Sequence, residues 1–168
     1  MADVAETIEA SGRRIGHHAW VEMRLFETLG RWSGTVADPR AKALLAGQSH
    51  HHAWHAELWY ALLPALPHLP AADLVAPSEA TSELVAALAE LDEAPAGADA
   101  DEADDVARLT AIYREALPRV AAAYRDHLAL TTPATDGPTI RALGLVLADL
   151  DADARAGLEL TAALEGRY

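Results

Sequence analysis

The amino-acid sequence predicts an all-α protein, and three observations indicate this fold class. Alanine and leucine are abundant, whereas alternating runs of β-branched residues are almost absent. Apolar residues recur at helical spacing, as Ile8, Ile15 and Leu29 do near the start of the chain. The prolines gather between the periodic segments rather than within most of them. With 168 residues, of which 51% are hydrophobic, the chain is expected to form one domain with a substantial core.

Start and stop signals place the first two helices. The first is expected over residues 4–32, because its apolar stripe ends there and a glycine follows two residues later. Asp38 as the N-cap and Pro39 at the first helical position then begin a second helix, expected over residues 39–63. The linker between the two helices is short. We therefore expect them to pack as an antiparallel hairpin over residues 4–63.

The middle of the chain differs in composition from its two ends. Residues 64–77 contain four prolines, and a short helical pattern at residues 78–91 and an acidic stretch rich in alanine follow up to residue 105. This composition predicts a long crossover that carries one accessory helix. A second hairpin is expected over residues 105–165, with a bend at Pro118 in its first helix and a turn near residues 131–138.

Charge and composition exclude several classes of function. The formal net charge of −13 argues against nucleic acid or an anionic membrane surface as the main partner. The absence of cysteine excludes disulfides, thiolate metal sites and a cysteine nucleophile. Neither a phosphate-binding loop nor a dinucleotide fingerprint is present, so we expect no organic cofactor. The first residues do not resemble a secretion signal, and we expect a cytoplasmic protein.

Ionisable residues interrupt the apolar faces of the first hairpin. Four histidines fall within six residues of the second predicted helix: His50, His51, His52 and His55. A helix turns by about 100° per residue, so residues seven apart lie on nearly the same line along its surface. His51 lies on the line of Leu44 and Leu58, whereas Gln48 and His55 share the line of Ala41 and Leu62. His52 follows Leu45 and Trp59 and is placed at the flank of this face.

On the first predicted helix, Glu22 also interrupts an apolar line. It lies on the line of Ile8, Ile15 and Leu29, and His18 lies beside it.

Folding the first hairpin about Val36 brings Glu22 level with His51, and His18 level with His55. Burial of an unpaired carboxylate or imidazolium is costly, so these groups need a partner. A divalent ion such as iron, manganese or zinc suits carboxylate and imidazole ligands. The alternative is a hydrogen-bonded pair of Glu22 and His51 that organises the core without a metal.

The second hairpin offers fewer inward-facing ligands. Asp151 lies nearest to the apolar arc of the fourth helix and is the best carboxylate candidate, whereas Asp149 and Asp153 are placed outside that arc. His127 faces inward near a helix end, where we expect a core histidine. The predicted ligands are therefore Glu22, His51 and Asp151, supplemented by His18, His55 and Gln48.

The predicted order of elements is a pair of helices, a long connection and a second pair. This order resembles that of the ferritin-like superfamily. In that superfamily a Glu on the first helix faces a Glu-x-x-His on the second, and the third and fourth helices repeat the pattern to hold two metals. This chain offers Glu22 and Gln48-x-x-His51, and most of the second set is missing. The resemblance therefore implies a single-metal site or a descendant without metal, rather than a di-iron oxidase or an iron store. A DinB-like bundle, which uses three histidines for one ion, is the other fold considered.

Two functions of different classes follow from these patterns. The first is a metal-binding bundle that performs redox or metal-assisted chemistry on a small-molecule substrate. The second is a non-catalytic interaction protein with a metal-free polar core, which forms a homodimer through tryptophans of the first hairpin. Trp54 lies away from the inward face of its helix. If its side chain is exposed, it offers a contact surface for a partner; the alternative is that it packs under the crossover.

Overall fold

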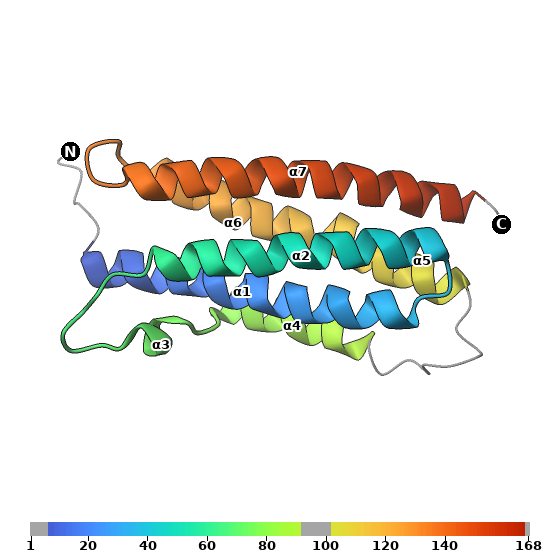
Figure 1. Ribbon diagram of the computed structural model, residues 1–168, viewed down its shortest axis with the longest axis horizontal. Helices are drawn as coiled ribbons and strands as arrows, with labels where there is room; N and C mark the ends of the chain where they lie inside the picture. Colours follow the sequence, from blue (N-terminus) through green and yellow to red (C-terminus); the bar gives the residue numbers. More distant parts are fainter. Residues whose placement is uncertain (1–6, 92–101, 167–168) are drawn as a thin grey trace.

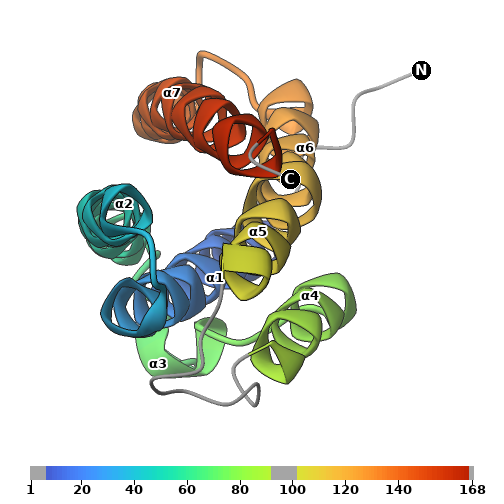
Figure 2. The same ribbon diagram turned by 90° about the vertical axis from the view of Figure 1, so that its right-hand side faces the viewer.

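The computed structural model describes residues 7–91 and 102–166, which form helices and turns without a β-strand. The all-α prediction is confirmed. Four long helical segments lie side by side (Figures 1 and 2). They are α1 (Ile8–Thr35), α2 (Pro39–Ala61), the composite segment of α5 (Glu102–Thr110), η1 (Ala111–Ala116) and α6 (Leu117–Leu130), and α7 (Gly137–Glu165). The expected helix start at residues 4–6 and most of the acidic stretch lie outside the described residues.

The order and direction of these segments follow the predicted two-hairpin plan. Helices α1 and α2 form one antiparallel pair, and α6 and α7 form the other (Figure 1). Helix α2 and the α5–α6 segment run in the same direction, so the chain between them crosses the length of the molecule (Figure 1). Viewed end on, α1 lies next to α2 and the α5–α6 segment, and α7 completes the group (Figure 2). Side chains from all four segments therefore meet along a common axis.

Capping explains the sharp turn of the first hairpin. The carboxylate of Asp38 accepts hydrogen bonds from the backbone N–H groups of Arg40 (2.7 Å) and Ala41 (3.3 Å), so the predicted N-cap is confirmed. The buried carboxylate of Asp105 accepts from the backbone N–H groups of Ala37 and Asp38. Asp105 thus fastens the turn of the first hairpin to helix α5 and fixes how the two hairpins meet.

In the part of the crossover that the structure describes, there are two helices rather than one. Helix α4 (Glu79–Glu90) confirms the predicted accessory helix, and Ser78 forms a capping box with Thr81 at its start. The additional helix α3 (Ala71–Leu74) was not predicted, because one turn among several prolines has too few residues to show a period. Both helices contact α1, and they lie outside the group of four long segments (Figure 2).

The predicted bend at Pro118 takes the form of a π-helical turn. Proline has no N–H and its ring clashes with the carbonyl four residues earlier, so an α-helix cannot continue unchanged through this position. The turn η1 directly precedes it, and the N–H of Leu117 bonds to the carbonyl of Ile112, five residues back. The wider turn keeps Ile112, Tyr113 and Ala116 buried. No helix among the described residues is both long and apolar enough to cross a membrane.

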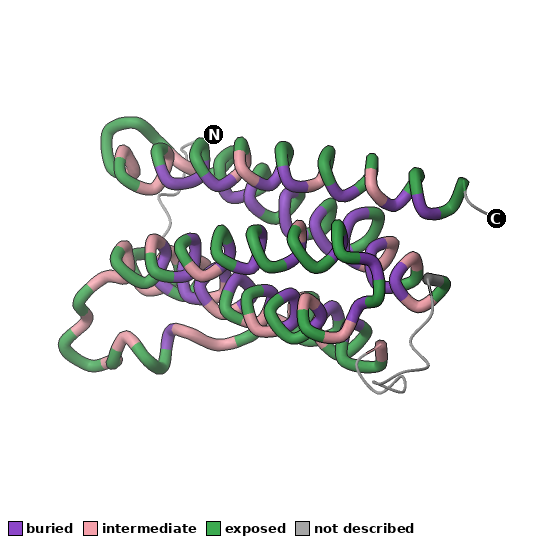
Figure 3. Tube along the Cα trace, turned by 45° about the vertical axis from the view of Figure 1, so that its right-hand side comes forward, coloured by how far each residue is buried: buried purple, intermediate pink, exposed green. Residues whose placement is uncertain are grey.

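The core runs between the four long segments, and buried stretches recur along each of these helices (Figure 3). Its largest fully buried side chains come from both hairpins: Trp32, Trp59, Tyr113 and Tyr124, with Leu25, Leu29, Leu45 and Leu143. This apolar mass surrounds a smaller set of buried ionisable groups. Those groups are the candidates for function, because each needs a partner that compensates for its burial.

At Gly16 the backbone of the crossover lies directly against α1. A Cβ atom at Gly16 would overlap the backbone carbonyl of Leu74, which cannot move as a flexible side chain could. We expect Gly16→Ala to destabilise the protein by about 1–3 kcal/mol, despite the better helix propensity of alanine. Urea unfolding measures this difference. The matched control is Gly47→Ala in α2, where no atom lies within 4 Å of the added carbon. Equal effects of the two substitutions would contradict this interpretation.

Candidate metal centre

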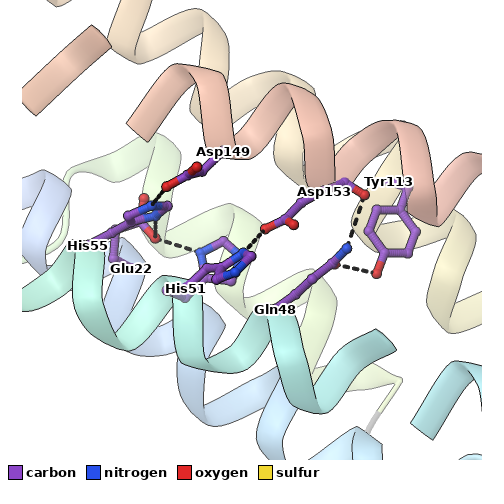
Figure 4. A network of polar contacts seen from close by, with 8 residues as sticks. Glu22, Gln48, His51, His55, Tyr113, Asp149 and Asp153 are labelled. Atoms are coloured by element: carbon purple, nitrogen blue, oxygen red, sulfur yellow. Dashed lines mark hydrogen bonds and ion pairs between the residues drawn. The ribbon is translucent and has the colours of Figure 1, made fainter. Parts of the chain in front are cut away.

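A buried carboxylate and two buried imidazoles meet at the centre of the first hairpin. Glu22 comes from α1, and His52 and His55 come from α2; all three residues are 0% exposed. The Nδ1 atom of His52 lies 2.5 Å from Oε2 of Glu22, and the Nδ1 atom of His55 lies 3.5 Å from the same oxygen. One oxygen of Glu22 therefore faces both histidines. Figure 4 shows Glu22 beside His55, with α7 on the other side of the histidine.

Two further residues fix the orientation of these groups. The phenol of Tyr124, on α6, donates a hydrogen bond of 2.5 Å to Oε1 of Glu22, which leaves Oε2 for the histidines. The carboxylate of Asp149, on α7, lies 3.1 Å from Nε2 of His55 and accepts a hydrogen bond from it (Figure 4). The Nδ1 atom of His55 is thereby directed toward Glu22. A carboxylate that holds the outer nitrogen of a histidine is a common supporting contact at metal sites.

Opposite charges stabilise this cluster against the cost of burial. Burial alone would raise the pKa of Glu22, but His52 and then His55 hold that pKa at about 2. Burial alone would lower the pKa of His55, but its contacts with Glu22 and Asp149 prevail and raise that pKa above its usual value. Burial, and then the charge of Glu22, raise the pKa of Tyr124 well above its usual value, so the phenol stays protonated. The cluster thus contains an ionised carboxylate beside a basic imidazole.

Two nitrogen atoms in the cluster have no hydrogen-bond partner. They are Nε2 of His52 and Nδ1 of His55, and both are inaccessible to solvent. Buried polar atoms are nearly always satisfied, so unpaired nitrogens at one site indicate a missing partner. Single ligand atoms of Glu22, His52 and His55 lie within 4.8 Å of one another. Two imidazoles and a carboxylate suit iron, manganese or zinc. The residues present therefore fit a divalent metal ion.

A second polar group joins α2 to α7 one turn away. The Nδ1 atom of His51 lies 2.8 Å from the carboxylate of Asp153, whose backbone carbonyl accepts a hydrogen bond from the amide of Gln48 (Figure 4). The phenol of Tyr113 donates to the amide oxygen of Gln48 at 2.6 Å. Gln48 is therefore buried but fully engaged in joining helices. Its interactions give it a structural role rather than a place in the cluster.

His18 and His127 form a separate buried pair between α1 and α6. Nε2 of His18 lies 2.9 Å from Nδ1 of His127, so the two rings share a hydrogen bond. Burial, and then the proximity of His127, lower the pKa of His18 well below its usual value. The His18 ring also contacts Trp59 and Tyr124. As predicted, His18 is buried, but it faces His127 rather than His55.

Three predicted placements are wrong. The side chain of His51 is 50% exposed, and His52 occupies the inward position instead. Asp151 is 59% exposed and pairs with Arg125 at 3.1 Å, so it cannot reach the core. Asp153, which was placed outside the apolar arc, is buried. The faces of α2 and α7 that point into the core differ from the predicted faces by a rotation about each helix axis. Each helix carries partly buried leucines beside its fully buried residues, so the sequence pattern does not single out one face.

His52, Tyr124 and Asp149 were the residues that sequence reasoning did not assign to the site. The signal for His52 was present, since Leu45 and Trp59 lie seven residues on either side of it and both are fully buried. Tyr124 is fully buried, but nothing in the sequence connected it to Glu22. Asp149 reaches His55 from a position 40% exposed to solvent, and only the packing of α7 against α2 reveals that contact.

Comparison of the chain with protein-family models, curated proteins and solved structures finds no significant match. The interpretation of the cluster therefore rests on its own geometry and chemistry.

Proposed function

We propose that this protein is a ferritin-like metalloprotein that binds one divalent metal ion through Glu22, His52 and His55. The observation that carries the proposal is the pair of buried, unpartnered imidazole nitrogens beside an ionised carboxylate. In an apolar interior each such nitrogen costs free energy, and a divalent cation bound among the three residues is a partner that imidazole nitrogens and a carboxylate can share. Iron, manganese and zinc are the ions whose preferences match this ligand set.

The ferritin-like assignment is supported by the order and direction of the helices. Two antiparallel pairs joined by a crossover, with α2 parallel to the α5–α6 segment, are what that superfamily requires (Figure 1). Glu22 on the first helix faces histidines on the second, which also agrees with the pattern. The departure is that, among the described residues, Glu22 supplies the one carboxylate of the three-residue ligand group. A single-metal centre is therefore favoured over the two-metal centre that is typical of the ferritin-like superfamily.

Burial of the cluster limits the chemistry it could perform. A bound ion would supply Lewis acidity or, for iron and manganese, one-electron redox chemistry. Tyr124 holds Oε1 of Glu22, and Asp149 holds Nε2 of His55, so both ligands are oriented before any ion arrives. Because all three ligand residues are 0% exposed, we infer that any substrate is a molecule of few atoms. We therefore propose redox or metal-assisted chemistry on a small molecule.

Cobalt(II) titration of metal-free protein tests this proposal through the visible absorption of the ion. We expect saturation at one ion per chain, with bands typical of nitrogen and oxygen ligands. The same protein without added metal supplies the baseline. Absence of visible bands up to a large excess of cobalt would contradict the proposed centre, as would saturation at two equivalent ions per chain.

Metal affinity is expected to increase with pH. Below its raised pKa, His55 carries a second proton, and a doubly protonated imidazole cannot bind a metal. Glu22, with a pKa of about 2, is already ionised and adds no dependence in the neutral range. On the acid side of the His55 pKa, the affinity should rise by about tenfold per pH unit, with one proton released per ion. Calorimetric titrations in buffers of different ionisation enthalpy count those protons; a pH-independent affinity would refute this expectation.

The alternative is a metal-free interaction protein, and two observations favour it. Glu22 already has two hydrogen bonds of 2.5 Å, from His52 and Tyr124, so the carboxylate itself is satisfied without an ion. Trp54 is 46% exposed rather than covered by the crossover, which offers an apolar contact for a homodimer. Sedimentation velocity over a wide concentration range tests this alternative. A monomer throughout would exclude the homodimer.

A further inference from the structure

A cavity of about 510 Å³ lies outside the bundle core, between the first hairpin and the crossover. Its walls are mainly apolar and come from three elements. From α1 come Ala19, Trp20 and Met23, from α2 come Ala56 and Tyr60, and Val75 follows α3. No residue of the proposed metal cluster lines it. Cavities that hold small molecules commonly measure about 300–1,000 Å³, so this one is large enough for a compact organic ligand.

The sequence explains why side chains leave this space unfilled. Four of the lining residues are alanines, Ala19, Ala56, Ala61 and Ala72, where larger side chains would close the cavity. Gly16 allows the backbone of Leu74 to lie directly against α1, and Leu74 is only 1% exposed. The crossover wall is therefore clamped to the hairpin, and the cavity is formed before any ligand arrives. A preformed site loses less free energy to ordering when it binds.

Arg24 gives the cavity its polar character. Its guanidinium lies 5.8 Å from the ring centroid of Trp20, and its Nη1 atom pairs with Glu27 at 2.9 Å. The guanidinium group of Arg24 lines the cavity and carries several N–H donors, so it can donate a hydrogen bond to an acceptor oxygen of a ligand. Because the arginine charge is already paired, the acceptor need not be charged.

The charges around the cavity disfavour an anionic ligand. Glu57 also lines the wall, and the whole chain carries a formal net charge of −13. Both would repel a carboxylate or a phosphate. The aromatic rings of Trp20 and Tyr60 and the thioether of Met23 favour contact with a flat ring system. We propose that this cavity binds an uncharged, ring-containing apolar molecule with a carbonyl oxygen that accepts a hydrogen bond from the guanidinium group of Arg24.

Methionine methyl resonances offer a direct test, because the chain contains only Met1 and Met23. Protein labelled with carbon-13 at the methionine methyl groups is titrated with three naphthalenes of similar shape: 2-acetylnaphthalene, 2-ethylnaphthalene and 2-naphthoate. We expect the neutral ketone to shift the Met23 methyl signal saturably, while Met1 serves as the internal reference. The hydrocarbon should bind about tenfold more weakly, since it lacks the acceptor, and the anion should bind more weakly than the ketone.

Two variants connect the signal to the cavity. Ala72→Phe fills the wall from an exposed position and should abolish the shift, whereas Ala46→Phe, exposed on α2 but outside the cavity, should leave it unchanged. Arg24→Leu should remove the preference for the ketone over the hydrocarbon while apolar binding persists. The proposal is overturned if the ketone gives no saturable Met23 shift, if Ala72→Phe still binds it, or if the anion binds best. None of these readouts depends on the metal.

Discussion

Replacement of Glu22 with alanine in the metal-free protein is expected to destabilise the fold by about 3–5 kcal/mol. The substitution leaves His55 without the carboxylate that raises its pKa, and it removes the acceptor of the Tyr124 phenol and of His52. Each of these groups is fully buried, so water cannot replace the lost partner. Since domains of this size have a total stability of about 5–15 kcal/mol, the loss is a large fraction of the whole.

Urea unfolding measures the effect, with Glu159→Ala as the matched control. Glu159 is exposed in the middle of α7, and its replacement should change the free energy of unfolding by less than about 0.5 kcal/mol. A loss below about 1 kcal/mol in Glu22→Ala would show that the buried pairing contributes little. The helical content of the variant, followed by circular dichroism, shows whether it remains folded enough for the comparison.

The pH dependence of stability provides a second view of Glu22. Its pKa falls from an ordinary value near 4.5 to about 2 in the fold. The stabilisation is therefore fully present above pH 4.5 and is lost as the pH falls through 2; it amounts to about 3 kcal/mol at the usual conversion. His55 acts in the opposite sense, because a raised pKa adds stability at low pH that is lost as pH rises through that pKa. Glu22→Gln should flatten the acid limb of the stability profile.

His52→Ala is expected to reduce divalent-metal affinity by at least about 100-fold, because it removes one of only three ligand residues. The neighbouring substitution His51→Ala is the matched control. His51 lies on the same helix, is 50% exposed and contacts Asp153 rather than Glu22. Its removal should leave metal affinity within about twofold. Competition of each purified variant against a chromophoric chelator measures both affinities on one scale.

The comparison of His52 and His51 separates the site from nonspecific binding by a histidine-rich helix. Equal losses in both variants would mean that the histidines act as a surface cluster. Retained stoichiometric binding in His52→Ala would rule out the proposed ligand set. Because His52 is buried, His55→Ala serves as an independent second variant, and it should reproduce the loss of affinity.

The fold could be predicted largely because its signals are local. Asp38 and Pro39 define a helix start within two residues, and Ser78 does the same for α4. The long crossover is visible as a change in composition. The π-turn before Pro118 was predicted only as a bend, since the sequence does not specify which hydrogen-bonding pattern absorbs the proline.

The site was harder to predict because it depends on the rotation of each helix about its own axis. Glu22 and His55 were correctly placed inward, but α2 has apolar residues on several sides and shows little preference for one face. The prediction took the line of Leu44 as the inward face of α2, whereas the neighbouring line of Leu45 is the buried one. His51 was therefore assigned to the site in place of His52. On α7, the same kind of rotation exchanged Asp151 for Asp149 and Asp153. Only contacts with the other hairpin resolve such a choice.

Metal content is the most direct test of the proposed function. The protein should be expressed without a polyhistidine tag, purified without chelators and analysed by elemental mass spectrometry, then analysed again after reconstitution with iron, manganese and zinc in turn. We predict about one equivalent of one of these ions per chain, lost in His52→Ala and kept in His51→Ala. Substoichiometric metal under every condition, with no difference between the two variants, would contradict a metal centre and leave a buried polar network in its place.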